Sequence, residues 1–181
     1  ESAPTGEESV IELVCAVSGK IAKAALNLGA LGKAKGGEPS DEDYEVFESA
    51  GGARLIAKGR QILSGLSFKD NDFDRPAREL SGGWIMRAHL ARLLVMEPDL
   101  LMLDEPMEAF DPAARRVAVD LLREAAASGR AVLVSSHDLA STQRLCDRVI
   151  FLWDGRVIRE GSTGALLAEA GQVVHVTLRE P

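Results

Sequence analysis

Two adjacent carboxylates, Asp104 and Glu105, directly follow a short apolar run at residues 100–103. A histidine, His137, follows the next such run along the chain, at residues 131–135. Short apolar runs are typical of strands buried on both faces of a parallel sheet. Ligands of such sheets bind beyond the carboxyl ends of the strands. We therefore expect these three side chains to meet at one edge of a sheet.

Phosphoryl transfer from a nucleotide is the chemistry that suits these groups. An acid at the end of a strand can bind Mg²⁺ while phosphates fill other positions, and this role falls to Asp104. Glu105 can orient or deprotonate the attacking water, and His137 can donate to the γ-phosphate. Two alternatives stay open at this point. The acids can instead be a plain helix cap, and His137 can be an ordinary surface histidine.

A glycine turn, LSGG at residues 80–83, opens a segment that is expected to be helical to about Met96. Backbone N–H groups at such a turn attract phosphate oxygens, and the glycines allow close approach. The hydroxyl of Ser81 adds one more donor beside Gly82 and Gly83. A turn of this kind is weak evidence alone, but its order and spacing relative to the acids and the histidine indicate a nucleotide site.

The elements that must position these residues fall into an α/β class with two parts. Residues 1–79 are expected to be a mainly helical subdomain, and residues 80–170 an α/β core fragment with parallel strands. Residues 171–181 are expected to hold a last strand. The segments expected to be helical are residues 9–28, 41–47, 53–65, 112–127, 138–146 and 165–170. Asp154-Gly155 predicts a hairpin between residues 148–153 and 156–159.

The bulk composition excludes several classes of protein. The chain has 181 residues and a net charge of −7, so nothing overall suggests a nucleic-acid surface. No apolar run is long enough to span a membrane, and residues 1–10 are unlike a signal peptide. Cys15 and Cys146 have no metal-binding spacing. We expect a reduced, cytoplasmic protein that reaches a membrane only peripherally, through a partner.

Taken together, these motifs resemble those of the ATP-binding cassette (ABC) ATPases. The LSGG turn is similar to their signature motif, and residues 100–105 are similar to Walker B with its catalytic glutamate. Residues 108–111 occupy the D-loop position, and residues 135–138 the position of the switch histidine. The resemblance implies an incomplete P-loop NTPase-type core that uses ATP and Mg²⁺, with Asp104 at the metal and Glu105 and His137 as catalytic groups.

In this family ATP is held between two cassettes, so the resemblance also implies a partner. Ser81, Gly82, Gly83 and Asp111 would then bind the nucleotide that the second cassette holds. A membrane transporter subunit and the ribosome are the further candidate partners, because the two halves of the chain resemble different subfamilies. Residues 1–106 resemble the ribosome-associated F subfamily, whereas residues 107–181 resemble transporter cassettes. A divergent natural cassette and a recombined chain both explain this difference.

Trp84 stands where the family's signature usually continues with glutamine. Its indole can pack into the helical part of the chain, or it can stack at an interface where a nucleotide lies. Both alternatives remain open from the sequence alone.

The family's phosphate-binding loop, Walker A, cannot be identified in the sequence, and neither can its Q-loop. The pairs Gly19-Lys20 and Gly32-Lys33 lack the glycine and the hydroxyl residue that the motif requires. The sequence reads as though it begins after that segment. We therefore expect the isolated chain to be an inactive part of an ATPase that needs a partner or a missing segment. The alternative is a non-enzymatic interaction module or inert scaffold.

Overall fold

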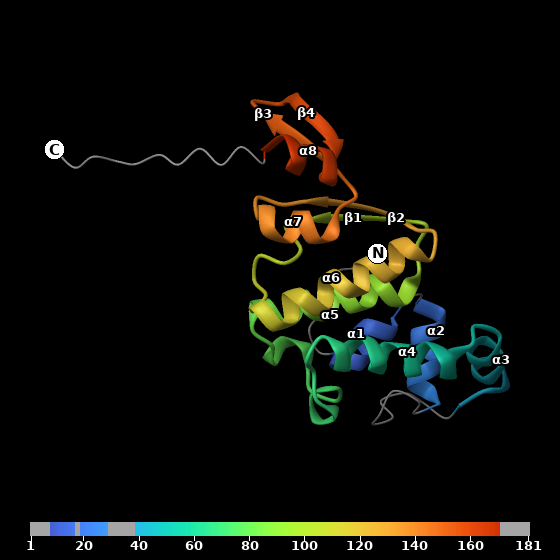
Figure 1. Ribbon diagram of the computed structural model, residues 1–181. Coiled ribbons are helices and arrows are strands. Elements are labelled where there is room, and N and C mark those ends of the chain that lie inside the picture. Colours follow the sequence, from blue (N-terminus) through green and yellow to red (C-terminus); the bar gives the residue numbers. More distant parts are fainter. Residues whose placement is uncertain (1–7, 17–18, 29–38, 171–181) are drawn as a thin grey trace. The chain divides into compact units, whose positions relative to one another are not determined.

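The computed structural model describes residues 8–16, 19–28 and 39–170, and it divides the chain into two compact units at Ser135/Ser136 (Figure 1). Each unit is described separately. The first contains α1 (Val10–Cys15), α2 (Gly19–Asn27), α3 (Asp41–Ser49), α4 (Gly52–Gly65), α5 (Gly82–Met96), β1 (Leu100–Asp104), α6 (Pro112–Ala127) and β2 (Ala131–Ser135). Two short 3₁₀ turns, Asp70–Asp72 and Ala77–Glu79, connect α4 to α5.

The first helix, α1, is the centre of the helical part. Its N-terminus has a capping box, in which the Ser9 hydroxyl accepts from the Glu12 amide and the Glu12 carboxylate accepts from the Ser9 amide. All of its residues are buried, because α1 contacts both α4 and α5. The expected single helix over residues 9–28 is wrong. Ala16 leaves the helical conformation with ψ of 55°, and α2 begins only at Gly19.

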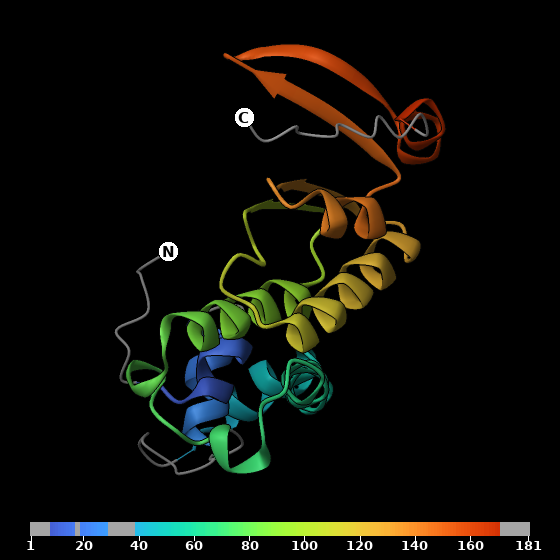
Figure 2. The same ribbon diagram turned by 60° about the vertical axis from the view of Figure 1, so that its left-hand side comes forward.

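The first unit has three layers, in which α5 and α6 lie between the N-terminal helices and the two strands (Figures 1 and 2). The helix that follows the glycine turn, α5, contacts α1 and α4. It therefore packs on the helical part of the chain. The predicted domain boundary between residues 79 and 80 stays a prediction.

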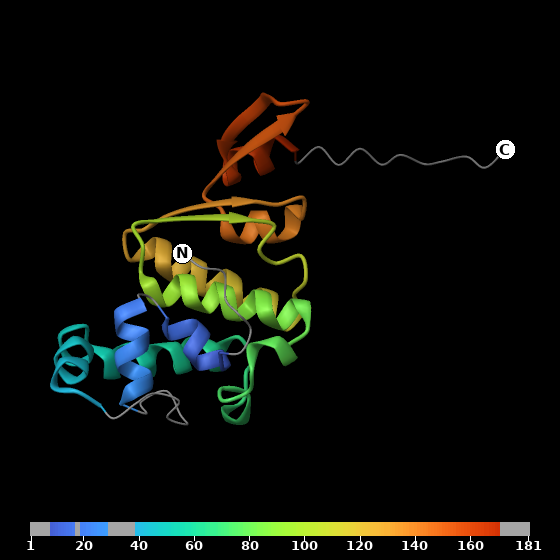
Figure 3. The same ribbon diagram turned by 180° about the vertical axis from the view of Figure 1, so that it is seen from behind.

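The strands β1 and β2 pair in parallel, and α6 forms the crossover between them (Figure 3). Their register sets Met102 opposite Leu133 and Asp104 opposite Ser135. The predicted parallel strands are confirmed, but the prediction that they are buried on both faces is wrong. Leu101 is 2% exposed, whereas Met102 is 68% exposed. Side chains alternate between the two faces of a strand, and one face of this sheet carries exposed apolar residues.

The second unit contains α7 (Leu139–Leu145), β3 (Arg148–Trp153), β4 (Arg156–Ser162) and α8 (Thr163–Ala170). The predicted hairpin is confirmed: β3 and β4 are antiparallel, and Asp154 and Gly155 both have positive φ. Thr163, at the start of α8, donates its hydroxyl to the Cys146 carbonyl at 2.5 Å. Residues 171–181, where a last strand is expected, lie outside the described residues.

Candidate functional site

The predicted acids lie at the carboxyl ends of the two parallel strands, where β1 and β2 finish side by side. Asp104 is the last residue of β1 and is paired in register with Ser135, the last residue of β2. The Ser135 hydroxyl donates a hydrogen bond to Oδ1 of Asp104. Asp104 is exposed, and this bond fixes the orientation of a carboxylate that remains accessible to solvent.

Glu105 begins the turn that leads from β1 towards α6. Its amide donates to the Ser135 hydroxyl at 3.1 Å and to the Ser135 carbonyl at 3.3 Å. Its φ of 43° lies in the left-handed region, which costs a residue with a side chain on the order of 1 kcal/mol or more. Met107 and Phe110 are buried and hold the turn in place. A strained acid directly beside a second acid is typical of a functional turn.

His137 lies in the second unit, immediately before α7. Its neighbour Asp138 caps this helix by accepting from the amides of Ala140 and Ser141 and from the Ser141 hydroxyl. The cap fixes the backbone next to His137 within this unit. The prediction that His137 joins Asp104 and Glu105 stays a prediction.

The glycine turn forms the N-terminus of α5, with Ser81 as its N-cap residue. Within the described part of the chain, the Ser81 side chain makes no capping hydrogen bond. Gly83 lies directly against the turn after β1: a Cβ atom at this position would be 2.7 Å from the Ala109 carbonyl oxygen. At Gly82 no described atom lies within 4 Å of the position that a Cβ would take. Gly83 is thus the glycine that the local packing requires.

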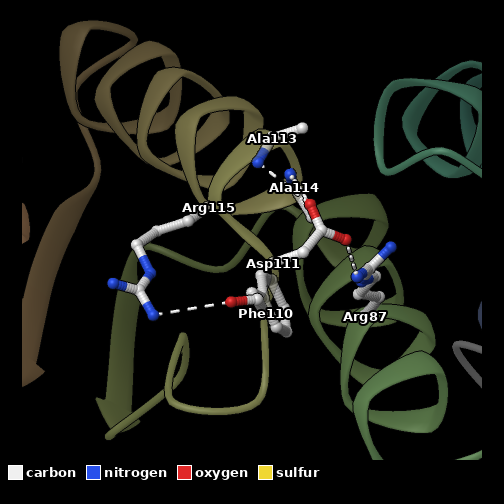
Figure 4. Close-up of polar contacts among 6 residues, drawn as sticks. All are labelled: Arg87, Phe110, Asp111, Ala113, Ala114 and Arg115. Atoms are coloured by element: carbon white, nitrogen blue, oxygen red, sulfur yellow. Dashed lines mark hydrogen bonds and ion pairs between the residues drawn. The ribbon is translucent and has the colours of Figure 1, made fainter.

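Asp111 uses its carboxylate within the first unit (Figure 4). Oδ1 accepts from the amides of Ala113 and Ala114, both at 2.9 Å, and Oδ2 accepts from Arg87 at 2.5 Å. The hydrogen bond from the Ala114 amide, followed by the one from Arg87, lowers the pKa of this carboxyl. Asp111 therefore acts as the N-cap of α6 and as the counterion of Arg87. Its predicted contact with a partner's nucleotide stays a prediction.

Arg87 is a residue that the sequence reasoning did not select. Its side chain is buried, and its guanidinium lies 4.5 Å from the centre of the Trp84 ring and 5.5 Å from that of Phe110. The helical spacing of the sequence could have indicated it, because Arg87 falls on the same face of α5 as the buried Leu90 and Leu94. A charged residue on an apolar helical face predicts a buried partner.

Trp84 packs against the helical part of the chain, which is one of the two alternatives left open by the sequence. Its ring meets that of Phe68 edge to face, with centroids 4.8 Å apart. The opposite alternative, stacking on a nucleotide, is not needed to explain its environment.

The described residues contain no group of three or more histidine, cysteine, aspartate or glutamate side chains that could hold a metal ion. A magnesium ion at Asp104 would therefore take most of its oxygen ligands from phosphates and water, as magnesium sites at nucleotides commonly do. In the same part of the chain, no helix is both long and apolar enough to cross a membrane.

Known proteins similar to this chain are ATP-binding cassettes. Residues 27–108 match the family model described as ABC transporter. The chain is 43% identical over 128 residues to the Nod factor export ATP-binding protein I of Burkholderia orbicola (strain AU 1054). That match covers 70% of this chain and 42% of the relative, so this chain spans less than half of that protein's length.

Solved structures of ATP-binding cassettes share the fold. One is a dimeric cassette in a post-hydrolysis state bound to ADP and Pi, with a TM-score of 0.58 and 22% identity over 86% of this chain and 57% of that one. Another is the ATP-binding subunit of an ABC transporter, with a TM-score of 0.58 and 23% identity over 93% of this chain and 59% of that one. The predicted α/β fold class, a cassette-type core with parallel strands and a helical part, is confirmed.

Proposed function

From its membership of the ATP-binding cassette family, we propose that this chain is the part of an ABC ATPase that carries the catalytic acids and the signature turn. The observation that carries this proposal is the placement of Asp104 and Glu105. They lie at the carboxyl ends of parallel strands, where the Ser135 hydroxyl donates to the Asp104 carboxylate and accepts from the Glu105 backbone amide. This is where α/β proteins bind their ligands.

Each group has a distinct role in the proposed hydrolysis of ATP. Asp104, oriented by the Ser135 hydroxyl, would hold Mg²⁺ through a carboxylate oxygen. Mg²⁺, when bound, neutralises charge on the phosphate oxygens. Glu105 would orient or deprotonate the attacking water, and His137 would donate to the γ-phosphate. Ser81, Gly82 and Gly83 would offer a hydroxyl and backbone amides to the phosphates of a nucleotide held by a second cassette.

We expect the isolated chain to be inactive for an electrostatic reason. The carboxylates of Asp104, which is exposed, and Glu105, which is half-buried, would repel the phosphates of ATP unless cations and amides compensate the charge. The family's phosphate-binding loop supplies that compensation, and neither Gly-Lys pair of this sequence has the required spacing. The exposed apolar face formed by Leu100, Met102 and Leu133 separately supports the proposal that this chain is one part of an ATPase. Covering it with the remaining part of a cassette would complete the sheet.

The partners follow from the proposed role. A second cassette would complete the ATP sandwich, as the dimeric state of the similar solved cassette suggests. The relative named for Nod factor export favours a membrane transporter subunit over the ribosome, and location at the membrane would then come from that subunit. The likeness of residues 1–106 to the F subfamily keeps the ribosome as the second candidate.

The decisive experiment combines nucleotide binding with hydrolysis. We expect the chain alone to show no magnesium-dependent ATP hydrolysis above that of Glu105→Gln, and weak binding of a fluorescent ATP analogue. We expect addition of the N-terminal part of a related cassette to restore hydrolysis. That gain should be absent with Glu105→Gln and with Asp104→Ala. If the wild type, Glu105→Gln and Asp104→Ala gained the same hydrolysis after this addition, the proposed roles of Asp104 and Glu105 would be contradicted.

The second candidate function is a non-enzymatic interaction module, favoured by the same exposed sheet face. In that case the chain would bind a cassette or transporter subunit with equal affinity before and after Glu105→Gln, and no hydrolysis would appear. A folded chain that binds neither nucleotide nor partner would instead be an inert scaffold.

A further inference from the structure

A buried cation connects the glycine turn to the turn that follows β1. Arg87 belongs to the second turn of α5, one helical turn beyond Gly83, and its side chain is 5% exposed. Its Nη2 donates to Oδ2 of Asp111 at 2.5 Å, across 24 residues of sequence (Figure 4). The bond therefore joins two segments that are separated in the chain by β1.

Aromatic rings hold the guanidinium from both of these segments. Trp84 comes from the glycine turn and Phe110 from the turn after β1, at 4.5 Å and 5.5 Å from the guanidinium carbon. A cation over the face of an aromatic ring is attracted by the ring's quadrupole, and more strongly where water is excluded. Trp84 is itself fixed by its edge-to-face contact with Phe68. The Arg87 side chain thus contacts Trp84 in the glycine turn, and both Phe110 and Asp111 in the turn after β1.

The charge on Arg87 is satisfied mainly by Asp111. Within the described part of the chain, Nε of Arg87 is buried and has no hydrogen-bond partner. A buried guanidinium that loses its carboxylate would be left with unpaired charge, which is strongly unfavourable. Phe110 and Gly83 pack where the two segments meet, and the Ala109 carbonyl leaves no room for a Cβ at Gly83. Any displacement of one segment would therefore disturb the other.

We propose that Arg87 is a positioning residue that fixes the glycine turn, residues 81–84, against residues 107–111, so that the two segments move as one body. The functional meaning of this coupling rests on the function proposed above, in which the glycine turn faces a nucleotide held by a partner cassette. Arg87 does not contact that nucleotide. It keeps the amides of Gly82 and Gly83 at a set distance from the turn that starts at the catalytic Glu105.

Hydrogen–deuterium exchange of the full chain without nucleotide tests this coupling directly. The main variant is Asp111→Ser, because serine still caps α6 but is too short to reach Arg87. We expect the amides of residues 85–87, which donate to the carbonyls of the glycine turn, to exchange about tenfold faster than in the wild type, although the substitution is 24 or more positions away in the sequence. Amides in α4 should keep their wild-type rates.

Substitutions at Arg87 supply the second arm. Arg87→Met, which keeps the apolar stem but removes the charge, should accelerate exchange in residues 107–113 as well as in residues 85–87. Arg87→Lys retains a positive charge but has a single ammonium group in place of the guanidinium. In this variant the same amides should exchange more slowly than in Arg87→Met but faster than in the wild type. The control is Arg116→Met on the exposed side of α6, which should change neither segment. Combining Arg87→Met with Asp111→Ser should add little to either alone, since both remove the same bond.

Three results would overturn the proposal. The first is that Asp111→Ser accelerates exchange near residue 111 while the amides of residues 85–87 stay protected. The second is acceleration that is equal in every segment including α4, which would indicate general destabilisation. The third is Arg87→Lys that behaves like Arg87→Met. None of these measurements involves nucleotide, so failure of the coupling and failure of the proposed ATPase role are distinguishable.

Discussion

At the scale of single residues, the two glycines of the signature-like turn have different reasons to be glycine. Gly83 lies against the Ala109 carbonyl, whereas the space beside Gly82 is open. Gly83→Ala would push a methyl group to 2.7 Å from that oxygen, and the backbone would have to move. We expect this substitution to lower the free energy of unfolding by about 1–3 kcal/mol, measured by urea denaturation.

Gly82→Ala is the matched control for Gly83→Ala. It adds the same methyl group to the same turn of α5, but no described atom lies within 4 Å of it. We expect its unfolding free energy to stay within about 0.5 kcal/mol of the wild type. Equal losses in the two variants would mean that general helix effects, and not contact with Ala109, decide the role of Gly83.

The lowered pKa of Asp111 predicts a specific dependence of the free energy of unfolding on pH. Hydrogen bonds from the Ala114 amide and from Arg87 lower its pKa in the folded chain below the usual value of about 3.9. A carboxyl whose folded pKa is lowered contributes stability above its unfolded pKa. That contribution is lost as the pH falls through the lowered folded value. We expect acid to destabilise the wild type more steeply below about pH 4 than it destabilises Asp111→Asn.

The measurement is the urea midpoint between pH 7 and pH 3 for both proteins. Asp120→Asn, an exposed acid on the same helix, is the control and should keep the wild-type slope. Part of the slope should remain in Asp111→Asn, because the pKa values of Asp43, Asp72 and Glu97 are also lowered. Identical slopes for wild type and Asp111→Asn would contradict the assigned role.

The sequence predicted the placement of the acids because strand ends can be read from local pattern. Asp104 and Glu105 follow an apolar run, and β1 does end at Asp104. Arg87 could not be assigned in the same way, since its partners Phe110 and Asp111 come from beyond β1. A contact across this separation depends on how α5 and α6 pack, which periodicity within one helix does not encode.

At the scale of elements, the strands show where local pattern fails. The run at residues 100–103 is apolar throughout, so it favours burial on both faces. In the structure Leu101 is buried, while Leu100 and Met102 on the other face are 54% and 68% exposed. Which face is covered depends on neighbouring elements and not on the strand itself.

Adjacent residues of β1 provide a direct test of this asymmetry. Leu101→Ala removes a side chain that is 2% exposed, and we expect it to cost about 2–5 kcal/mol of unfolding free energy. Met102→Ala removes one that is 68% exposed, and we expect a cost of less than about 1 kcal/mol. Urea denaturation measures both. A similar large loss in both variants would show that the second face is covered in solution.

At the scale of the whole molecule, the buried apolar core of the described residues lies in the first unit. Its fully buried large side chains include Ile11, Leu13, Leu63 and Leu122, and every buried apolar side chain among the described residues belongs to this unit. In the described part of the second unit, the buried residues are Ser141 and Thr163. Local hydrogen bonds and the hairpin hold that unit together, and these give little free energy without a core.

The two tryptophans allow the stability of each unit to be measured in the same chain. Trp84 lies in the first unit beside Arg87 and Phe68, and Trp153 ends β3 in the second unit with 74% of its surface exposed. We expect the Trp84→Phe variant, which reports through Trp153, to unfold at a lower urea concentration than Trp153→Phe, which reports through Trp84. Its emission should also be quenched more strongly by iodide before unfolding. A unit without a buried apolar core opens at lower free energy than one that has it. Coincident transitions in the two variants would contradict this expectation and would show that the whole chain unfolds as one cooperative unit.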